Sequence, residues 1–331
     1  MRRREFIALV GVAASATISE PFALWAQQRD LPVIGFLTGH SPSAFAQQRL
    51  AAVLKGLAEV GLVEGKNVAI EARWAETHYD RLPALVADLM RQQVKVIVTD
   101  TTPAALAAKA ATTTIPIVFG LSSDPVVLGL VSSLDRPGGN LTGAIRLGVD
   151  LGPKRLQLAH EILPAATSMA VLVNPANPAI AEPERIAVEA AARALGLELH
   201  VLEAGEERGI DQAFAAALQR RVSAVIVTAD ALFADHIAAL GALSVRHRMP
   251  TIFTYREFVA AGGLGGYSGS LTDAAHISGV YAGRILKGEK PADLPVQQST
   301  KVQMIINVKT AKALGITVPP SVLTRADDVI E

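Results

Sequence analysis

Short apolar runs alternate with longer amphipathic segments along nearly the whole chain, and this alternation constrains the fold more than any other feature. Runs such as 33–37 lack the in–out pattern of half-exposed strands, so they are typical of strands buried on both faces. The segments between them place apolar side chains at helical spacing, as Val53, Leu54 and Leu57 do. This succession predicts the α/β class, with parallel sheets covered by helices on both faces.

The expected elements are too many for one sheet, so they indicate two lobes. We expect strands at 33–37, 67–74, 94–100, 115–120, 140–147, 168–174, 197–203, 222–228, 251–255 and 263–267. We expect helices at 44–60, 81–91, 103–111, 153–162, 184–195, 210–219, 232–246 and 272–286. The turn Pro137-Gly138-Gly139-Asn140 interrupts the series, and the same rhythm begins again from Pro153. The chain therefore predicts two doubly wound parallel-sheet lobes with a cleft between them.

The N-terminus has the order of a secretory signal peptide. Three arginines at 2–4 precede an apolar stretch that is too short to span a bilayer, and small residues follow up to Ala26. We expect a signal peptide over 1–26, with cleavage near Ala26 and a periplasmic location. The Sec pathway and the twin-arginine pathway both remain open, because Arg3-Arg4 also fits a twin-arginine signal.

Composition excludes several classes of protein. Lys plus Arg and Asp plus Glu each number 31, a neutral balance that argues against nucleic acid as a partner. The chain has no cysteine, so it can form neither a disulfide framework nor a lipid-modified N-terminal cysteine. The seven histidines form no HExxH motif, and no glycine-rich phosphate loop follows a strand. We therefore expect no metal, no cofactor and no enzymatic activity.

Several collinear stretches together resemble one family. They include Gly-Leu-Val-Glu-Gly-Lys-Asn-Val at 61–68, Asp-Arg-Pro-Gly-Gly-Asn at 135–140, Asn-Pro-Ala-Asn-Pro at 174–178 and Gly-Ile-Thr-Val-Pro-Pro-Ser at 315–321. In these stretches the chain resembles the ABC-transporter substrate-binding family that includes the tryptophan-importer-like proteins, and the resemblance covers residues 31–331. One departure is Thr228-Ala229-Asp230, where the family has Thr-Asp-Asn, so the register of the acidic residue is open.

The resemblance implies the type 1 periplasmic-binding fold, in which three segments join two lobes. It implies a first lobe of 30–145 plus 270–296 and a second lobe of 146–269 plus 297–331. It also implies a soluble monomer that binds a small solute, with aromatic or branched amino acids as the favoured class, and that works with ABC permease subunits in the inner membrane.

Candidate site residues follow the strands, because ligands of parallel sheets lie beyond the carboxyl ends of the strands. In the first lobe we expect hydroxyl groups and helix N-termini to hold a solute carboxylate, without an arginine. The candidates from this lobe are Thr38, Ser41, Thr101, Thr102, Ser122, Ser123 and Asp124. Thr102 and Asp124 could equally serve only as helix caps.

The second lobe supplies Asn174, Asn177, Asp230, Tyr255 and Tyr267 as candidates. We expect the Asp230 carboxylate to accept hydrogen bonds from a solute ammonium group, although it could instead cap the following helix. An aromatic ring at a strand end could stack on a planar side chain of the solute.

Three classes of function remain open from the sequence. An importer receptor explains the signal peptide, the two lobes and the missing catalytic set. A periplasmic sensor for a membrane signalling partner would have the same sequence features. An exported hydrolase would need a serine hydroxyl paired with a histidine in the cleft.

Overall fold

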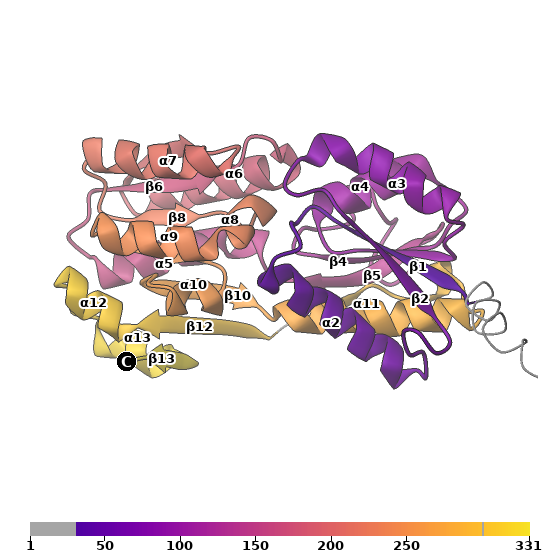
Figure 1. Ribbon diagram of the computed structural model, residues 1–331. Helices are drawn as coiled ribbons and strands as arrows, with labels where there is room; N and C mark the ends of the chain where they lie inside the picture. The colour runs from indigo at the N-terminus through magenta and orange to yellow at the C-terminus, as the bar shows by residue number, and fades with distance from the viewer. Residues whose placement is uncertain (1–30, 300) are drawn as a thin grey trace, which may run out of the picture.

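The computed structural model describes residues 31–299 and 301–331, which form two lobes lying side by side (Figure 1). The expected signal peptide lies outside the described residues. No helix within the described ranges is long and apolar enough to cross a membrane.

The first lobe is built on a parallel sheet. Its described strands, in the spatial order β11-β5-β4-β3-β1-β2, are β1 (Val33–Thr38), β2 (Ala69–Trp74), β3 (Val96–Thr99), β4 (Ile117–Leu121), β5 (Leu141–Arg146) and β11 (Gln297–Ser299). The helices are α2 (Ala44–Glu59), α3 (Leu82–Arg91), α4 (Thr102–Ala111) and α11 (Leu271–Leu286). Helices α3 and α4 share one apolar core with the sheet, and α2 and α11 share the other. Both faces are therefore covered, as the unalternating apolar runs predict.

The second lobe repeats this design. Its described strands, in the order β13-β12-β10-β9-β8-β6-β7, are β6 (Ser168–Val173), β7 (Glu198–Glu203), β8 (Val225–Val227), β9 (Thr251–Phe253), β10 (Gly265–Gly269), β12 (Val302–Asn307) and β13 (Asp328–Ile330). Its helices are α5 (Gly152–Ile162), α6 (Pro178–Ala194), α7 (Glu207–Gln219), α8 (Ala231–Asp235), α9 (Ile237–Arg246), α10 (Arg256–Ala260), α12 (Val308–Leu314) and α13 (Pro320–Arg325). Strand β12 runs antiparallel to β10, and the other pairings are parallel.

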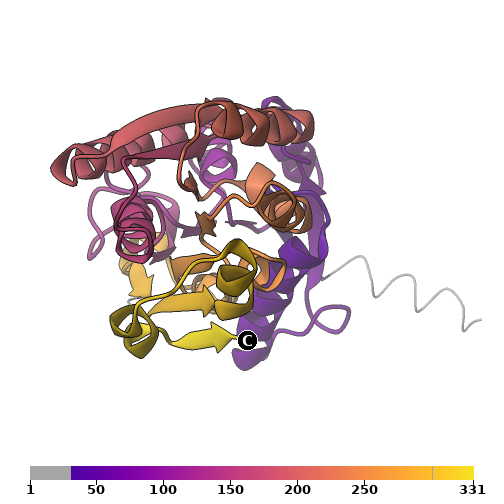
Figure 2. The ribbon, with the colours of Figure 1, turned by 90° about the vertical axis from the view of Figure 1, so that its left-hand side faces the viewer.

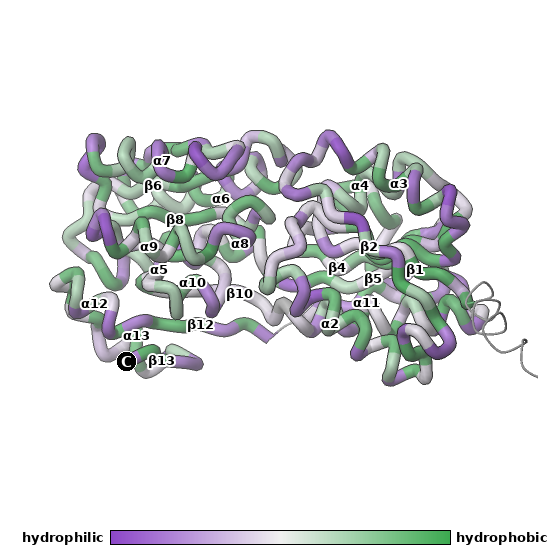
Figure 3. The backbone as a smooth tube through the Cα atoms, viewed as in Figure 1, coloured by the Kyte–Doolittle hydropathy of each residue, from purple (hydrophilic) through white to green (hydrophobic). Residues whose placement is uncertain are grey.

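The helices of the second lobe also cover both faces of its sheet. Residues of α7, α8, α9 and α10 pack in one core, and residues of α5, α6, α12 and α13 pack in the other. Seen from the side, these helices surround the strands (Figure 2). The hydrophobic stretches run through strands such as β8 and β4, whereas hydrophilic stretches mark outer turns of helices such as α7 (Figure 3).

The chain crosses between the sheets after Arg146, after Gly269, and between Ser299 and Val302. The third crossing lies later than the expected boundary at 296/297, because β11 pairs with β5 in the first sheet. Two of the three residues of β11, Gln297 and Gln298, are polar and exposed, so this edge strand carries no buried apolar pattern.

The expected helix 232–246 is divided in two at His236. Its ring Nδ1 donates a hydrogen bond to the carbonyl oxygen of Leu232 at 2.8 Å, in the place where the backbone N–H of a continuous helix would bond. Helix α8 is therefore a single short turn that directly follows β8 and its loop.

Candidate functional site

A cavity lies between the two lobes, at the carboxyl ends of their parallel strands, as the topology requires. The space free of protein atoms in and around it is about 340 Å³, a figure that includes open solvent. The first lobe lines it with His40, Arg49, Tyr79, Asp100, Thr101, Thr102, Pro103, Ser122 and Arg146. The second lobe lines it with Asn177, Ile180, Ala229, Ala231 and Tyr255.

Arg146 is the most unusual residue of the cavity, because it ends the buried strand β5 without a carboxylate partner among the described residues. Its Nη2 donates to the Tyr255 hydroxyl at 3.3 Å, and its Cζ lies 5.8 Å from the centre of that ring. Its Nη1 is buried and has no hydrogen-bond partner in the described part of the chain. Burial lowers the pKa of Arg146, and the nearby Arg49 lowers it further, while Tyr255 opposes the shift.

Arg49 and Asp100 form a buried ion pair beside Arg146. Arg49 Nε donates to Asp100 Oδ2 at 2.7 Å, and Arg49 Nη2 donates to the backbone oxygen of Asp100 at 2.5 Å. The second carboxylate oxygen, Oδ1, is buried and accepts no hydrogen bond from any described residue. The charges of Arg49 and Asp100 cancel each other, so the charge of Arg146 gives the cavity a net positive charge.

Hydroxyl groups and a helix N-terminus surround these charges. Helix α4 begins at Thr102, and the Thr101 side chain makes no capping bond to it but accepts a hydrogen bond from Gly39 N at 2.9 Å. Thr102 is therefore the first helical residue and not the cap, and its Oγ1 lies 3.2 Å from the Ser123 hydroxyl. The positive end of the α4 dipole is thus directed toward the cavity.

Asp230 has its hydrogen-bonding capacity filled by protein donors. Asn174 Nδ2 and Asn177 Nδ2 donate to its carboxylate at 2.8 and 2.6 Å, and the Leu232 backbone N–H donates at 2.9 Å. The Tyr79 hydroxyl of the first lobe donates to both oxygens, at 2.9 and 3.1 Å. Burial, together with the Asp230 charge, raises the pKa of Tyr79 well above its ordinary value, so this phenol keeps its proton and remains a donor. Asp230 caps α8, joins the lobes and does not line the cavity.

The other expected site residues divide into two groups. Thr101, Thr102, Ser122, Asn177 and Tyr255 line the cavity. Thr38, Ser41, Ser123, Asp124, Asn174 and Tyr267 do not line it. The Thr38 hydroxyl accepts from His40 N, Asp124 is exposed and caps a turn at Val126, and the Tyr267 carbonyl accepts from Arg155.

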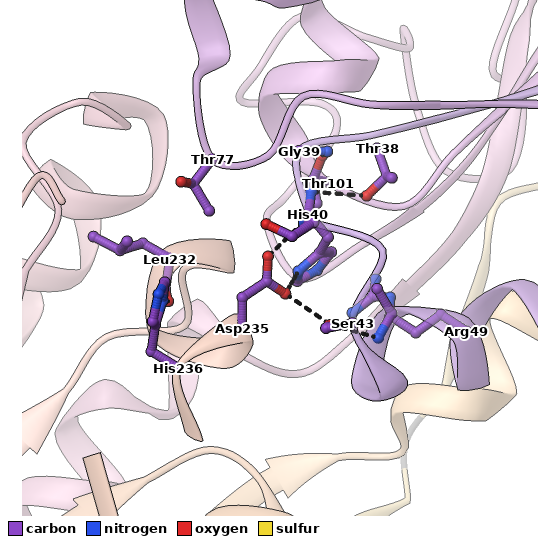
Figure 4. Close-up of polar contacts among 12 residues, drawn as sticks. Thr38, Gly39, His40, Ser43, Arg49, Thr77, Thr101, Leu232, Asp235 and His236 are labelled. Carbon is purple, nitrogen blue, oxygen red and sulfur yellow. Dashed lines mark hydrogen bonds and ion pairs between the residues drawn. The ribbon is translucent and has the colours of Figure 1, made fainter. Parts of the chain in front are cut away.

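Asp235, at the end of α8, holds the lobes together beside the cavity (Figure 4). Its carboxylate accepts hydrogen bonds from His40 Nδ1 at 2.8 Å, Ser41 N at 2.5 Å and the Ser43 hydroxyl at 3.2 Å, all in the first lobe. Burial alone would raise the pKa of Asp235, but the bonds from His40 and Ser41 outweigh burial and lower it. We call Asp235 with His40, Ser41 and Ser43 the lobe latch.

Sequence reasoning did not select four charged residues of this region: Arg49, Asp100, Arg146 and Asp235. A signal was present for two of them. Asp100 directly follows the apolar run Val96-Ile97-Val98, and Arg146 lies within the strand-like segment 140–147. A charge at the end of a strand buried on both faces needs a partner, so each marks a site.

Among the described residues, no serine hydroxyl hydrogen-bonds to a histidine ring, and no cluster of three or more His, Asp or Glu side chains could hold a metal ion.

Two α/β lobes, joined by three crossings and enclosing a polar cavity, define the chain as a bilobal solute-binding protein of the type 1 periplasmic-binding architecture. The chain belongs to the family described as ABC transporter substrate binding protein, whose sequence pattern matches residues 33–330.

The chain is similar to a curated protein and to two solved structures, and the likeness to the structure at 23% identity shows the fold alone. A tyrosine-binding protein of Clostridioides difficile is 26% identical over 267 residues, which cover 80% of this chain and 75% of that protein. An ABC domain from Streptococcus pneumoniae, solved in complex with L-Trp, has 25% identity and a TM-score of 0.80, over 91% of this chain and 100% of that one. A ligand-free, open substrate-binding protein from Clostridium difficile has 23% identity and a TM-score of 0.62, over 91% of this chain and 99% of that one.

Proposed function

We propose that this protein is the solute-binding component of an ABC importer, and that it closes around an amino acid with an aromatic or branched side chain, or a related carboxylate. In this proposal it acts in the periplasm after removal of a signal peptide near Ala26, as a monomer that delivers its solute to ABC permease subunits in the inner membrane. The unpaired guanidinium of Arg146 in the cavity carries the proposal.

A solute carboxylate would compensate the charge of Arg146. A buried ion without a partner costs several kcal/mol, roughly the amount lost when one member of a buried ion pair is removed. A charge-assisted bond to Nη1 would offset that cost, and the hydroxyls of Thr102 and Ser122 with the N-terminus of α4 favour the same negative group. An uncharged sugar would leave the guanidinium without a counter-ion.

The remaining lining suits an apolar side chain. Ile180, Ala229, Ala231 and the Tyr255 ring come from the second lobe, opposite the charged groups of the first. The names of two relatives, a tyrosine-binding protein and an L-Trp complex, support an aromatic amino acid as the solute.

A ligand screen on the mature protein tests this function. Amino acids, aromatic acids, small amides and sugars are compared by thermal shift, and hits are measured by calorimetry. A ligand at about 100 times its Kd stabilises a protein by about 2.7 kcal/mol, so a cognate amino acid raises Tm clearly. Stabilisation by sugars alone would contradict the proposal.

The variant Arg146→Met tests whether Arg146 binds the carboxylate of the solute. We expect it to weaken binding of the identified carboxylate at least ~30-fold, about 2 kcal/mol or more, because the solute carboxylate loses its charged donor. The unliganded variant should remain folded, since an unpaired buried charge is removed. Arg136→Met, the same change at an exposed position, is the control and should bind normally. Unchanged affinity in Arg146→Met would remove the basis of the carboxylate assignment.

A further inference from the structure

Two residues that line this cavity, one of each charge, each carry a buried atom without a hydrogen-bond partner among the described residues. Asp100 and Arg146 both line it, and each residue is only 5% exposed. Asp100 Oδ1 and Arg146 Nη1 accept or donate no hydrogen bond among the described residues. Because an unsatisfied buried polar group is costly, each atom marks a place for a ligand group of opposite character.

The two unsatisfied atoms match the two charged groups of an amino acid. Arg146 Nη1 is a donor for a carboxylate, and Asp100 Oδ1 is an acceptor for an ammonium group. Asp100 already bonds Arg49 through Oδ2 only, so one oxygen stays available. Both residues stand at carboxyl ends of strands of the same sheet, after β3 and at the end of β5.

Asp230 has no carboxylate oxygen left without a hydrogen-bond donor. Its oxygens already accept bonds from Tyr79, Asn174, Asn177 and the Leu232 N–H. A solute ammonium would have to displace one of these donors, and the gain of the new bond would be offset by the bond that is lost.

We propose that Asp100, and not Asp230, receives the ammonium group of the bound amino acid, while Arg146 receives its carboxylate. This proposal rests on the amino-acid function proposed above. The zwitterion is then recognised entirely by the first lobe, and the side chain of the solute meets the largely apolar lining of the second. Asp230 accepts the hydrogen bond by which Tyr79 joins the two lobes. It is therefore a positioning residue that stabilises the closed state and does not touch the solute.

The test compares ligands that lack one charge each. For an aromatic solute the set is L-tryptophan, indole-3-propionate, which lacks the ammonium group, and tryptamine, which lacks the carboxylate. If the screen finds another amino acid, its own deaminated and decarboxylated analogues are used. On the wild-type protein, calorimetry should show each analogue binding at least ~100-fold more weakly, because a buried charge of the site is left unpaired.

The decisive quantity is the ratio of the Kd of the deaminated acid to the Kd of the amino acid. In Asp100→Asn this ratio should fall at least ~10-fold, since the ammonium group no longer has a charged acceptor. In Asp230→Asn both Kd values should rise together, and the ratio should stay at the wild-type value. Asp124→Asn, the same change at an exposed strand end outside the cavity, should alter neither.

Asp100→Asn leaves the Arg49 charge without its carboxylate, so the double variant Arg49→Gln/Asp100→Asn provides a second version in which both charges are removed. An unchanged ratio in a folded Asp100 variant overturns the proposal, and so does a ratio that collapses in Asp230→Asn. A wild-type protein that binds only carboxylates without an ammonium group also overturns this proposal. Failure to bind any amino acid or carboxylate is a different result, and it refutes the proposed function itself.

Discussion

Buried charges determine most of what single residues do in this protein. Arg146 and Asp100 line the cavity, and each has one buried atom without a partner among the described residues, whereas Arg155 and Glu184 pair with each other in the second lobe. Arg155 also donates to the carbonyls of Gly148 and Tyr267, on two segments next to the lobe crossings. Glu184 accepts a bond from Ala229 N, in the loop that lines the cavity. The pair therefore connects the hinge segments to the site.

Loss of this pair should destabilise the fold strongly. Burial raises the pKa of Glu184, and the Arg155 charge opposes the shift. Arg155→Met leaves Glu184 buried without its counter-ion, and we expect it to lower the free energy of unfolding by about 3–5 kcal/mol, measured by urea denaturation. Arg185→Met breaks more exposed ion pairs on α6, the helix that also carries Glu184, and should lower the free energy of unfolding by less than about 1 kcal/mol. An equal loss of unfolding free energy in the two variants would show that the buried pair stabilises the fold no more than the exposed pairs do.

The sequence predicted where the strands end, but it did not predict how the charged side chains near those ends pair in space. Thr101, Ser122 and Asn177 could be placed at the cavity because parallel topology brings the carboxyl ends of strands together. The pairing of Arg49 with Asp100 joins residues 51 positions apart, and strand-end positions do not fix side-chain directions. For the same reason, local patterns could not reveal that the Asp230 carboxylate accepts hydrogen bonds from two distant segments, at Tyr79 and at 174–177.

At the scale of elements, apolar patterning predicted ten of the thirteen described strands and missed β11, β12 and β13 at the end of the chain. Strand β11 is short and polar. Helix α6 starts at Pro178, six residues before the expected start, and contains Pro183. The buried Ile180 and Ala181 hold the first turn in place although Pro183 lies inside the helix.

Helices α2 and α11 approach each other backbone to backbone. A Cβ placed on Gly56 would lie 2.1 Å from the carbonyl oxygen of His276, and one on Gly279 would lie 2.0 Å from that of Val53. Glycine is therefore required on both sides of this contact, which covers one face of the first sheet.

Adding one methyl group at this contact should separate the helices. We expect Gly279→Ala to lower the free energy of unfolding by about 1–3 kcal/mol, because overpacking forces backbone shifts. Denaturation followed by circular dichroism measures the effect. Ala51→Leu adds bulk on the exposed side of α2 and serves as the control. Wild-type stability in Gly279→Ala would show that the helices can move apart at little cost.

At the scale of the whole molecule, the lobes are held closed by contacts that need no solute. The lobe latch, the Tyr79–Asp230 bond and the Phe45 ring, whose centre lies 4.7 Å from that of Tyr255, all cross the interface. Contacts of this kind favour the closed state, and the apparent affinity for a solute depends on how far that state is populated.

Weakening the lobe latch should open the empty protein and reduce affinity without changing solute preference. In Asp235→Asn we expect Kd to rise about 10-fold, or about 1.4 kcal/mol, for every solute that binds. Small-angle scattering should show a larger radius of gyration for the unliganded variant. Asp211→Asn, an exposed acidic residue of α7, provides the comparison. A change in the ranking of solutes would mean that Asp235 contacts the solute directly.

The position of α11 has a consequence for the order in which the protein is made. This helix covers the first sheet, yet it follows the whole of β6 to β10 in the chain, and the second sheet in turn is completed by β12 and β13. Because synthesis proceeds from the N-terminus, the first lobe waits for residues 271–286 while its partner is being translated. The core that α2 and α11 share therefore cannot be completed until the chain has been synthesised as far as α11.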